Sequence, residues 1–92
     1  MYAVVVNVSI APGQFAAARQ ALNEQVVPRA KQAPGFVKGY WTVRDDSSQG
    51  TSMTLFRTKQ DADNAVTMVR NTPTPPGVSL NSAEVREVIA EG

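Results

Sequence analysis

The sequence predicts one α+β domain whose elements follow the order β-α-β-β-α-β. Four segments rich in β-branched residues have alternating apolar positions, and two other segments have apolar residues at helical spacing. Stretches containing Gly and Pro separate these segments. With 92 residues, the chain has room for one small core. We therefore expect a single domain over residues 1–92 with a ferredoxin-like fold. In that fold a four-stranded antiparallel sheet carries both helices on one face, and the first and third strands are neighbours.

The first strand is expected over residues 2–10 and the first helix over residues 15–31. Both faces of the strand carry mostly apolar side chains, with the row Val4, Val6 and Val8 on one of them. An Ala-Pro-Gly stretch ends the strand. The apolar stripe of the helix is formed by Phe15, Ala18, Leu22 and Val26. Because Pro28 lies inside this run and has no backbone N–H to donate, it should kink the helix or end it early.

The next two strands are expected over residues 36–44 and 51–57, joined as a hairpin by the polar loop 45–50. Alternation in the second strand places Phe36, Lys38, Tyr40 and Thr42 on one face and Val37, Gly39, Trp41 and Val43 on the other. Neither face is plainly a solvent face.

The second helix is expected to begin after Thr58, because Thr58 and Asp61 have the spacing of a weak capping box. Its apolar stripe consists of Ala62, Ala65, Val66 and Val69. A proline-rich stretch then ends the helix, and a last strand is expected between residues 78 and 90.

The apolar content of both strand faces predicts a partner. Two helices cover only one face of a four-stranded sheet, yet the first two strands carry large apolar side chains on both faces. A monomer seldom exposes more than a few hundred Å² of contiguous apolar surface. We therefore expect a homodimer that packs through the open sheet face with two-fold symmetry.

The composition excludes several kinds of chemistry. The chain has no His and no Cys, which excludes disulfides, cysteine nucleophiles, Ser-His-Asp triads, and zinc or haem held through imidazole. The net charge of +1 argues against nucleic acid and against an electrostatic membrane anchor. No segment has the length of a membrane span, and no basic residue precedes the apolar N-terminal segment as in a secretory signal. We expect a cytoplasmic protein without a cofactor, a metal, a nucleic-acid partner or a membrane.

The carboxylates are expected to have structural roles. Asp45 and Asp46 lie in the hairpin loop, where Asp favours turns. Asp61 and Asp63 lie at a helix start, where a negative charge favours the cap and the helix dipole. No pair of carboxylates has the spacing of a two-carboxylate catalytic site or of an oxygen-ligand metal site.

Asn7 is an amide in an otherwise apolar strand, and two interpretations of it stay open. It bonds a neighbouring backbone group or water, or it is a polar group that lines a cavity. Tyr40 and Trp41 lie on opposite faces of one strand, so the sequence leaves open which of them lines a cavity. Each also fits packing in the core or in a dimer interface, and Phe56 fits the core.

RNA binding is a further hypothesis, because RRM domains share this order of elements. The segment from Lys38 to Val43 has the basic-Gly-aromatic opening of the RNA-binding octamer. That motif belongs on the third strand, however, and has a small residue where Trp41 stands and an aromatic residue where Thr42 stands. The motif and the net charge therefore both disfavour RNA.

Three short motifs stand out: Ala33-Pro34-Gly35-Phe36-Val37 leading into Gly39-Tyr40-Trp41, Leu55-Phe56 before a capped helix, and Glu84-Val85-Arg86-Glu87-Val88-Ile89. With the order of elements, these motifs resemble the antibiotic biosynthesis monooxygenase family of dimeric α+β barrels. The resemblance spans nearly the whole chain and implies a dimer with one cavity per subunit between sheet and helices. Catalytic relatives use this cavity to oxidise polycyclic phenols with molecular oxygen, without metal or flavin.

The resemblance also implies site residues. Asn7 matches a first-strand Asn that lines the cavity in haem-degrading relatives, and Phe56 stands where those relatives carry a Trp. Their haem-ligating His has no counterpart, so the cofactor-free branch is the one implied, with Asn7 and Tyr40 as candidate catalytic oxyanion donors. The expected ligand pocket comprises Asn7, Phe36, Tyr40 and Phe56. The first hypothesis is thus a dimeric cofactor-independent monooxygenase for aromatic phenols. The alternative is a non-catalytic dimer that binds a small apolar ligand or has a structural role.

Overall fold

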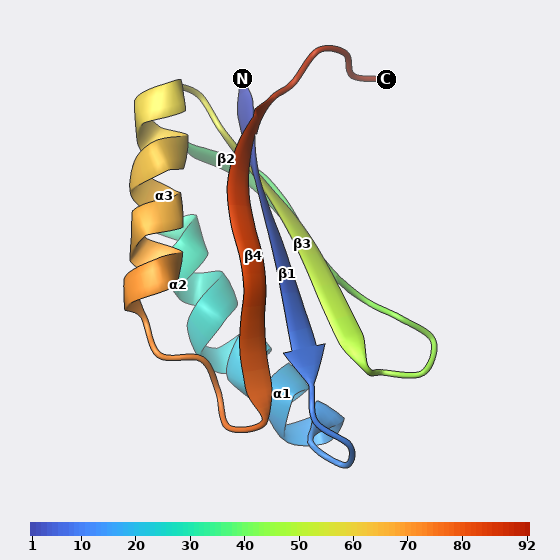
Figure 1. Cartoon of the computed structure of the whole chain (residues 1–92). Helices are drawn as coiled ribbons and strands as arrows, with labels where there is room; N and C mark the ends of the chain where they lie inside the picture. Colours follow the sequence, from blue (N-terminus) through green and yellow to red (C-terminus); the bar gives the residue numbers. More distant parts are fainter.

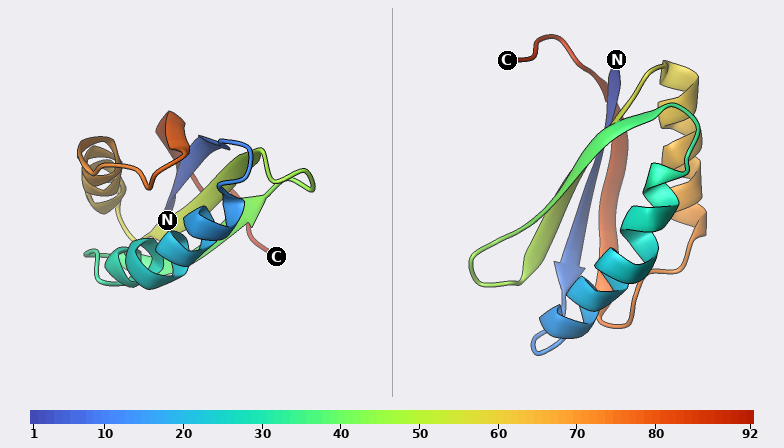
Figure 2. Two further views of the ribbon diagram at one scale, coloured as in Figure 1. Left: turned by 90° about the horizontal axis from the view of Figure 1, so that it is seen from below. Right: turned by 180° about the vertical axis from the view of Figure 1, so that it is seen from behind.

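The computed structural model describes residues 1–92 as a four-stranded sheet with two helical regions. The strands are β1 (Tyr2–Ile10), β2 (Phe36–Val43), β3 (Gln49–Phe56) and β4 (Val78–Glu87). The first helical region contains α1 (Phe15–Ala21), a π-helical segment (Leu22–Val26) and α2 (Val27–Lys31), and the second is α3 (Lys59–Asn71). Figure 1 and the end-on view in Figure 2 show both helical regions on the same side of the sheet.

The sheet has the predicted topology. Its strand order is β2-β3-β1-β4, and all three pairs of neighbouring strands are antiparallel. The first and third strands are therefore neighbours, and the ferredoxin-like α+β fold is confirmed. The last strand is shorter than predicted and ends at Glu87, because β1 begins at Tyr2 and offers no pairing partner beyond it. After Glu87, the N–H of Val88 donates to the carbonyl of Met1, and residues 88–92 form no strand.

The first helical region contains an irregularity directly before Pro28. The N–H of Val27 donates to the carbonyl of Leu22, five residues back, and α2 then begins with Pro28 in its first turn. Pro28 itself has no N–H for the carbonyl of Glu24. The helical run therefore continues to Lys31, and the expected disturbance takes the form of the π-helical segment.

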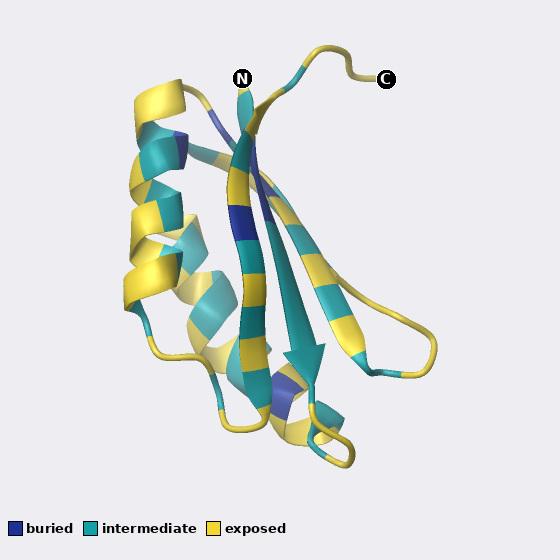
Figure 3. Ribbon diagram, viewed as in Figure 1, coloured by how far each residue is buried: buried dark blue, intermediate teal, exposed yellow.

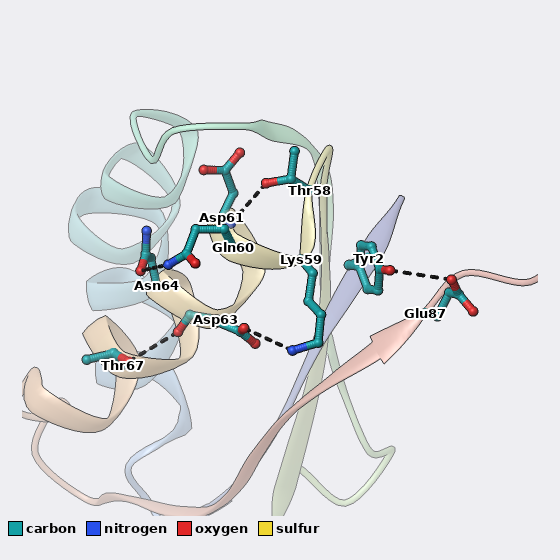
Figure 4. A network of polar contacts seen from close by, with 9 residues as sticks. All are labelled: Tyr2, Thr58, Lys59, Gln60, Asp61, Asp63, Asn64, Thr67 and Glu87. Atoms are coloured by element: carbon teal, nitrogen blue, oxygen red, sulfur yellow. Dashed lines mark hydrogen bonds and ion pairs between the residues drawn. The ribbon is translucent and has the colours of Figure 1, made fainter.

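The predicted cap of α3 is present. The Thr58 hydroxyl accepts a hydrogen bond of 3.1 Å from the N–H of Asp61 (Figure 4). In the first turns of the helix, Lys59 pairs with Asp63 at 3.1 Å, four residues on. None of the helices is both long and apolar enough to cross a membrane.

The buried core lies at the end of the sheet near the chain termini. Val4, Phe56 and Ala62 pack together with exposures of 1%, 2% and 0%, so this face of the sheet is the one that α3 covers. Figure 3 shows that most of the fully buried residues gather at this end. Only 8 of the 92 residues are buried, so most apolar side chains elsewhere on the helix face remain half-exposed.

A β-bulge near the start of β2 corrects the predicted faces of this strand. Phe36 pairs with Phe56, while Lys38 pairs with the preceding residue of β3, Leu55, so Val37 is the extra residue. Phe36 therefore does not share a face with Tyr40. Beyond the bulge the alternation is regular, so Gly39 and Trp41 lie on the helix face. Phe36 lies on this face as well.

Candidate functional site: a cavity between sheet and helices

A cavity of about 760 Å³ lies between the sheet and the helices. Of the 31 residues that line it, 19 are hydrophobic, so its wall is mainly apolar. The sheet contributes the apolar side chains of Val4, Val6, Val8, Ile10, Trp41, Val43, Phe56, Val78 and Leu80. The helices contribute those of Phe15, Ala18, Leu22, Val26, Val27, Ala30, Ala65, Met68 and Val69, and the loop after α2 contributes that of Ala33.

The cavity exists because the two helical regions approach the sheet unequally. α3 packs against β4, β1 and β3, and α2 packs against β2, whereas α1 and the π-helical segment contact chiefly each other and α2. Facing them, β1 supplies Val6 and Val8, and β3 supplies only Ser52 and Gly50 opposite these residues. Side chains this small do not fill the space under α1, so the valines stay half-buried.

The polar part of the cavity lining contains cations and hydroxyls but no acid. It consists of Arg19, Asn23, Arg29, Thr42, Thr51, Ser52, Thr54, Thr72 and Thr74. The hydroxyls of Thr42 and Thr51 are bonded within the sheet, to the Thr51 carbonyl and to Oδ1 of Asn7. No Asp, Glu, Lys or Tyr lines the cavity, so it holds no side chain suited to act as a general base near neutral pH. No buried side-chain polar atom lacks a hydrogen-bond partner.

Trp41 is the largest side chain on the cavity wall, and Gly39 gives it room. A Cβ atom on Gly39 would lie 2.8 Å from Cη2 of Trp41 and 2.9 Å from Cγ2 of Thr54. The far edge of the indole ring therefore lies against the backbone of β2, next to the side chain of Thr54 on β3. Between Trp41 and Tyr40, it is Trp41 that lines the cavity.

The two phenylalanines of the expected pocket lie together on the helix face. Their ring centroids are 6.0 Å apart with an interplanar angle of 80°, an edge-to-face contact. Phe56 is fully buried and lines the cavity, whereas Phe36 packs behind it against the core and is not a lining residue.

Asn7 and Tyr40 lie on the opposite face of the sheet, which we call the outer face. Asn7 pairs in register with Thr51 and Ser82, one position out of phase with Val6 and Val8, which line the cavity. Its Nδ2 donates to Oγ of Ser82 at 3.0 Å, and its Oδ1 accepts from Oγ1 of Thr51 at 2.7 Å. The position corrects the expectation of a cavity amide, because regular alternation through β1 turns this side chain away from the helices.

Tyr40 is also placed away from the cavity, and its side chain is well exposed. The residue is 58% exposed, and Nζ of Lys38 lies 5.8 Å from its ring centroid. Met53 pairs with Tyr40 on the same outer face and is 47% exposed. The buried residues Ala3 and Val5 also lie on this face. The outer face therefore carries apolar side chains flanked by the charged residues Lys38, Glu84 and Arg86 toward the chain termini, and polar side chains around Asn7.

The carboxylate of Asp46 has the turn-forming role that the sequence predicts. The carboxylate of Asp46 accepts hydrogen bonds from Oγ of Ser48 at 2.6 Å and from the N–H of Ser48 at 3.0 Å. These bonds, helped by the nearby Arg44, hold the pKa of the Asp46 carboxyl below its usual value of 3.8. No group of three or more acidic side chains is placed to hold a metal ion.

No protein-family model and no curated protein sequence matches this chain. Solved structures similar in fold include the following two. The first is the monooxygenase from the ActVA-Orf6 gene of Streptomyces coelicolor, in complex with the ligand nanaomycin D. It matches with a TM-score of 0.59 and 13% identity over 99% of this chain and 92% of that chain.

The second is a mutant of MhuD with two manganese protoporphyrin IX molecules bound per active site. It matches with a TM-score of 0.59 and 12% identity over 98% of this chain and 97% of that chain. Both likenesses extend over almost the full length of the chain and of its neighbours. The chain therefore shares the α+β ferredoxin-like fold of these two proteins.

Proposed function

We propose that this protein binds an apolar, aromatic small molecule in the cavity between the sheet and the helices. The observation that carries the proposal is the combination of a volume of about 760 Å³ with a mainly apolar wall. Ligand pockets usually measure about 300–1,000 Å³ and are apolar with a few polar groups, which matches this lining. A ligand would cover the half-buried valines and the indole of Trp41, and each CH₂ group removed from water contributes about 0.8 kcal/mol.

The fluorescence of Trp41 provides a signal for a binding assay, because Trp41 is the only tryptophan of the chain. Titration with anthracene-type and hydroxyanthrone ligands should change its fluorescence and saturate with one ligand per subunit. Val8→Phe, which adds bulk inside the cavity, should weaken binding, whereas Val37→Phe, outside the cavity, should not. Absence of binding, or equal weakening by both variants, would reject the proposal.

A second candidate function is oxidation of the bound ligand by molecular oxygen without a cofactor. The similarity in fold to a monooxygenase in complex with nanaomycin D supports this candidate. Because no acid–base side chain lines the cavity, the substrate would need an acidic phenol of its own. Oxidation of a ring CH₂ to C=O by O₂ releases one water molecule, and the four electrons that reduce O₂ come from the substrate.

The residues for such a reaction differ from those expected from the family resemblance. Asn7 and Tyr40 lie on the outer face, so the cavity donors available to a phenolate are Ser52, Thr54 and the arginines. Oxygen consumption with hydroxyanthrones tests this candidate. Turnover above the buffer control that falls in Val8→Phe and persists in Asn7→Ala supports it, and turnover equal to the control rejects it.

A haem-dependent reaction does not fit the residues present. The chain has no His or Cys, no Tyr lines the cavity, and the only sulfur in the lining is that of Met68, which is 45% exposed. The lining thus offers no imidazole, thiolate or phenolate as an axial ligand. We derive no step through haem.

The protein is further proposed to form a homodimer through the outer sheet face. Tyr40 and Met53 form an exposed apolar pair there, beside the buried Val5. Beyond β4, Ile89 is 91% exposed and has no partner within the chain. Light scattering should give twice the mass of the chain, and Met53→Lys should give the mass of one chain, whereas Met68→Lys should not. A monomeric mass at micromolar concentration would reject the dimer.

A further inference from the structure

The cavity has an unbalanced charge, which gives information about its ligand. Two arginines line it, from α1 and from α2, and no acidic residue does. The ion pairs of the protein are Arg44 with Asp46, Lys59 with Asp63, and Arg86 with Glu84, so neither cavity arginine has a carboxylate partner. An apolar cavity with unpaired guanidinium groups favours a ligand that carries a negative charge.

Arg19 lies at the rim of the cavity. Together with Phe15 and Asn23 it lines both the cavity and a second groove on the solvent side of the helix, so these residues separate the interior from solvent. Glu24 lies in that outer groove, where it accepts a hydrogen bond from Nε2 of Gln20 at 3.3 Å, and it forms no ion pair with Arg19. A guanidinium at a rim is placed to bind the charged end of a ligand whose apolar body lies inside.

Trp41 indicates the shape of the apolar body. The edge of its indole ring packs against the backbone at Gly39, and this contact positions the ring on the cavity wall. A flat aromatic surface held by the sheet favours a planar ring system that stacks on it. The residues under the helix, Val6 and Val8, leave space beside this ring.

We infer that the ligand of the cavity is an aromatic carboxylate whose rings stack on Trp41 and whose carboxylate pairs with Arg19 at the rim. This inference rests on the proposed ligand-binding function and adds the charge and the orientation of the ligand. It predicts that a planar acid binds more tightly than a neutral molecule of the same shape.

The test compares anthracene-2-carboxylate with anthracene-2-carboxamide by isothermal titration calorimetry on the full chain. The acid should bind about five- to tenfold more tightly than the amide, and this preference should shrink with added salt. Arg19→Gln should abolish the preference, because it should weaken binding of the acid more than binding of the amide. Arg57→Gln, which removes an exposed arginine outside the cavity, should preserve the preference.

The stacking contact has its own readout. Ring-current shifts of the anthracene protons in NMR spectra should appear with the wild-type protein and disappear with Trp41→Leu. Trp41→Leu should weaken acid and amide by the same factor of about ten, with Trp41→Phe in between.

The outcomes separate the two proposals. If neither compound binds, both the proposed function and this inference fail. If the amide binds as tightly as the acid, the cavity binds ligands but the charge inference is wrong. Loss of the preference in Arg29→Gln or Arg57→Gln instead of Arg19→Gln would also overturn it.

Discussion

Gly39 and Trp41 form a matched pair on the cavity wall. The place where a side chain at position 39 would begin is taken by the indole ring, whose Cη2 would be 2.8 Å from a Cβ atom. Gly39, in the edge strand β2, therefore leaves the space that the ring of Trp41 occupies. The pair places an aromatic side chain on the cavity wall.

This contact predicts the effect of Gly39→Ala. Elsewhere in a strand, replacing Gly by Ala would stabilise by roughly 0.5–1 kcal/mol. Here the added methyl would collide with Trp41 and Thr54, and overpacking of this kind costs about 1–3 kcal/mol. We expect the free energy of unfolding in urea to fall and the fluorescence maximum of Trp41 to shift to longer wavelength. Gly92→Ala, where nothing lies within 4 Å, is the control, and a more stable Gly39→Ala protein would contradict the contact.

Asn7 is predicted to contribute to stability and not to ligand binding. Asn7→Ala removes hydrogen bonds to Thr51 and Ser82 in the centre of the outer face, and each such bond contributes about 0.5–1.5 kcal/mol. We expect an unfolding free energy lower by about 1–2 kcal/mol, with ligand affinity unchanged. Ser79→Ala, an exposed serine on the same face, is the control. If Asn7→Ala instead weakened ligand binding and left the unfolding free energy unchanged, the placement of Asn7 on the outer face would be wrong.

Asp46 should make stability depend on acid pH. Its pKa is lower in the folded protein than the ordinary 3.8 because Ser48 donates two hydrogen bonds to the carboxylate. A lowered pKa contributes stability that is present above the unfolded value and is lost as the pH falls through the folded value. NMR titration of the Asp46 carboxyl should give a midpoint below 3.8, and Ser48→Ala should raise it. An unchanged midpoint in Ser48→Ala would contradict this cause.

The sequence predicts the elements well because local signals and tertiary packing agree. The alternating valines of β1, the polar hairpin loop and the cap at Thr58 all have the structure that their residue types favour. The strand order then follows from the element order. The bounds differ most at two places. β3 begins at Gln49, inside the expected loop, where Gln49 and Gly50 pair with Ser9 and Val8 of β1. β4 ends at Glu87, because the length of β1 and not the composition of residues 88–90 limits the pairing.

The site was predicted less well, for two physical reasons. A single extra residue in β2, Val37, moves Phe36 to the face of Trp41, and no local pattern signals this bulge. The family resemblance predicts Asn7 in the cavity, although alternation with Val6 and Val8 turns it to the other face. The role of Arg19 depends on the distance of α1 from the sheet, which is a tertiary property.

The structure of the protein in complex with anthracene-2-carboxylate tests the central claim most directly. We expect one molecule per chain between the sheet and the helices, with its rings against Trp41 and its carboxylate at Arg19. A molecule bound instead on the outer face beside Tyr40, or a filled cavity without room for it, would contradict the proposed binding site.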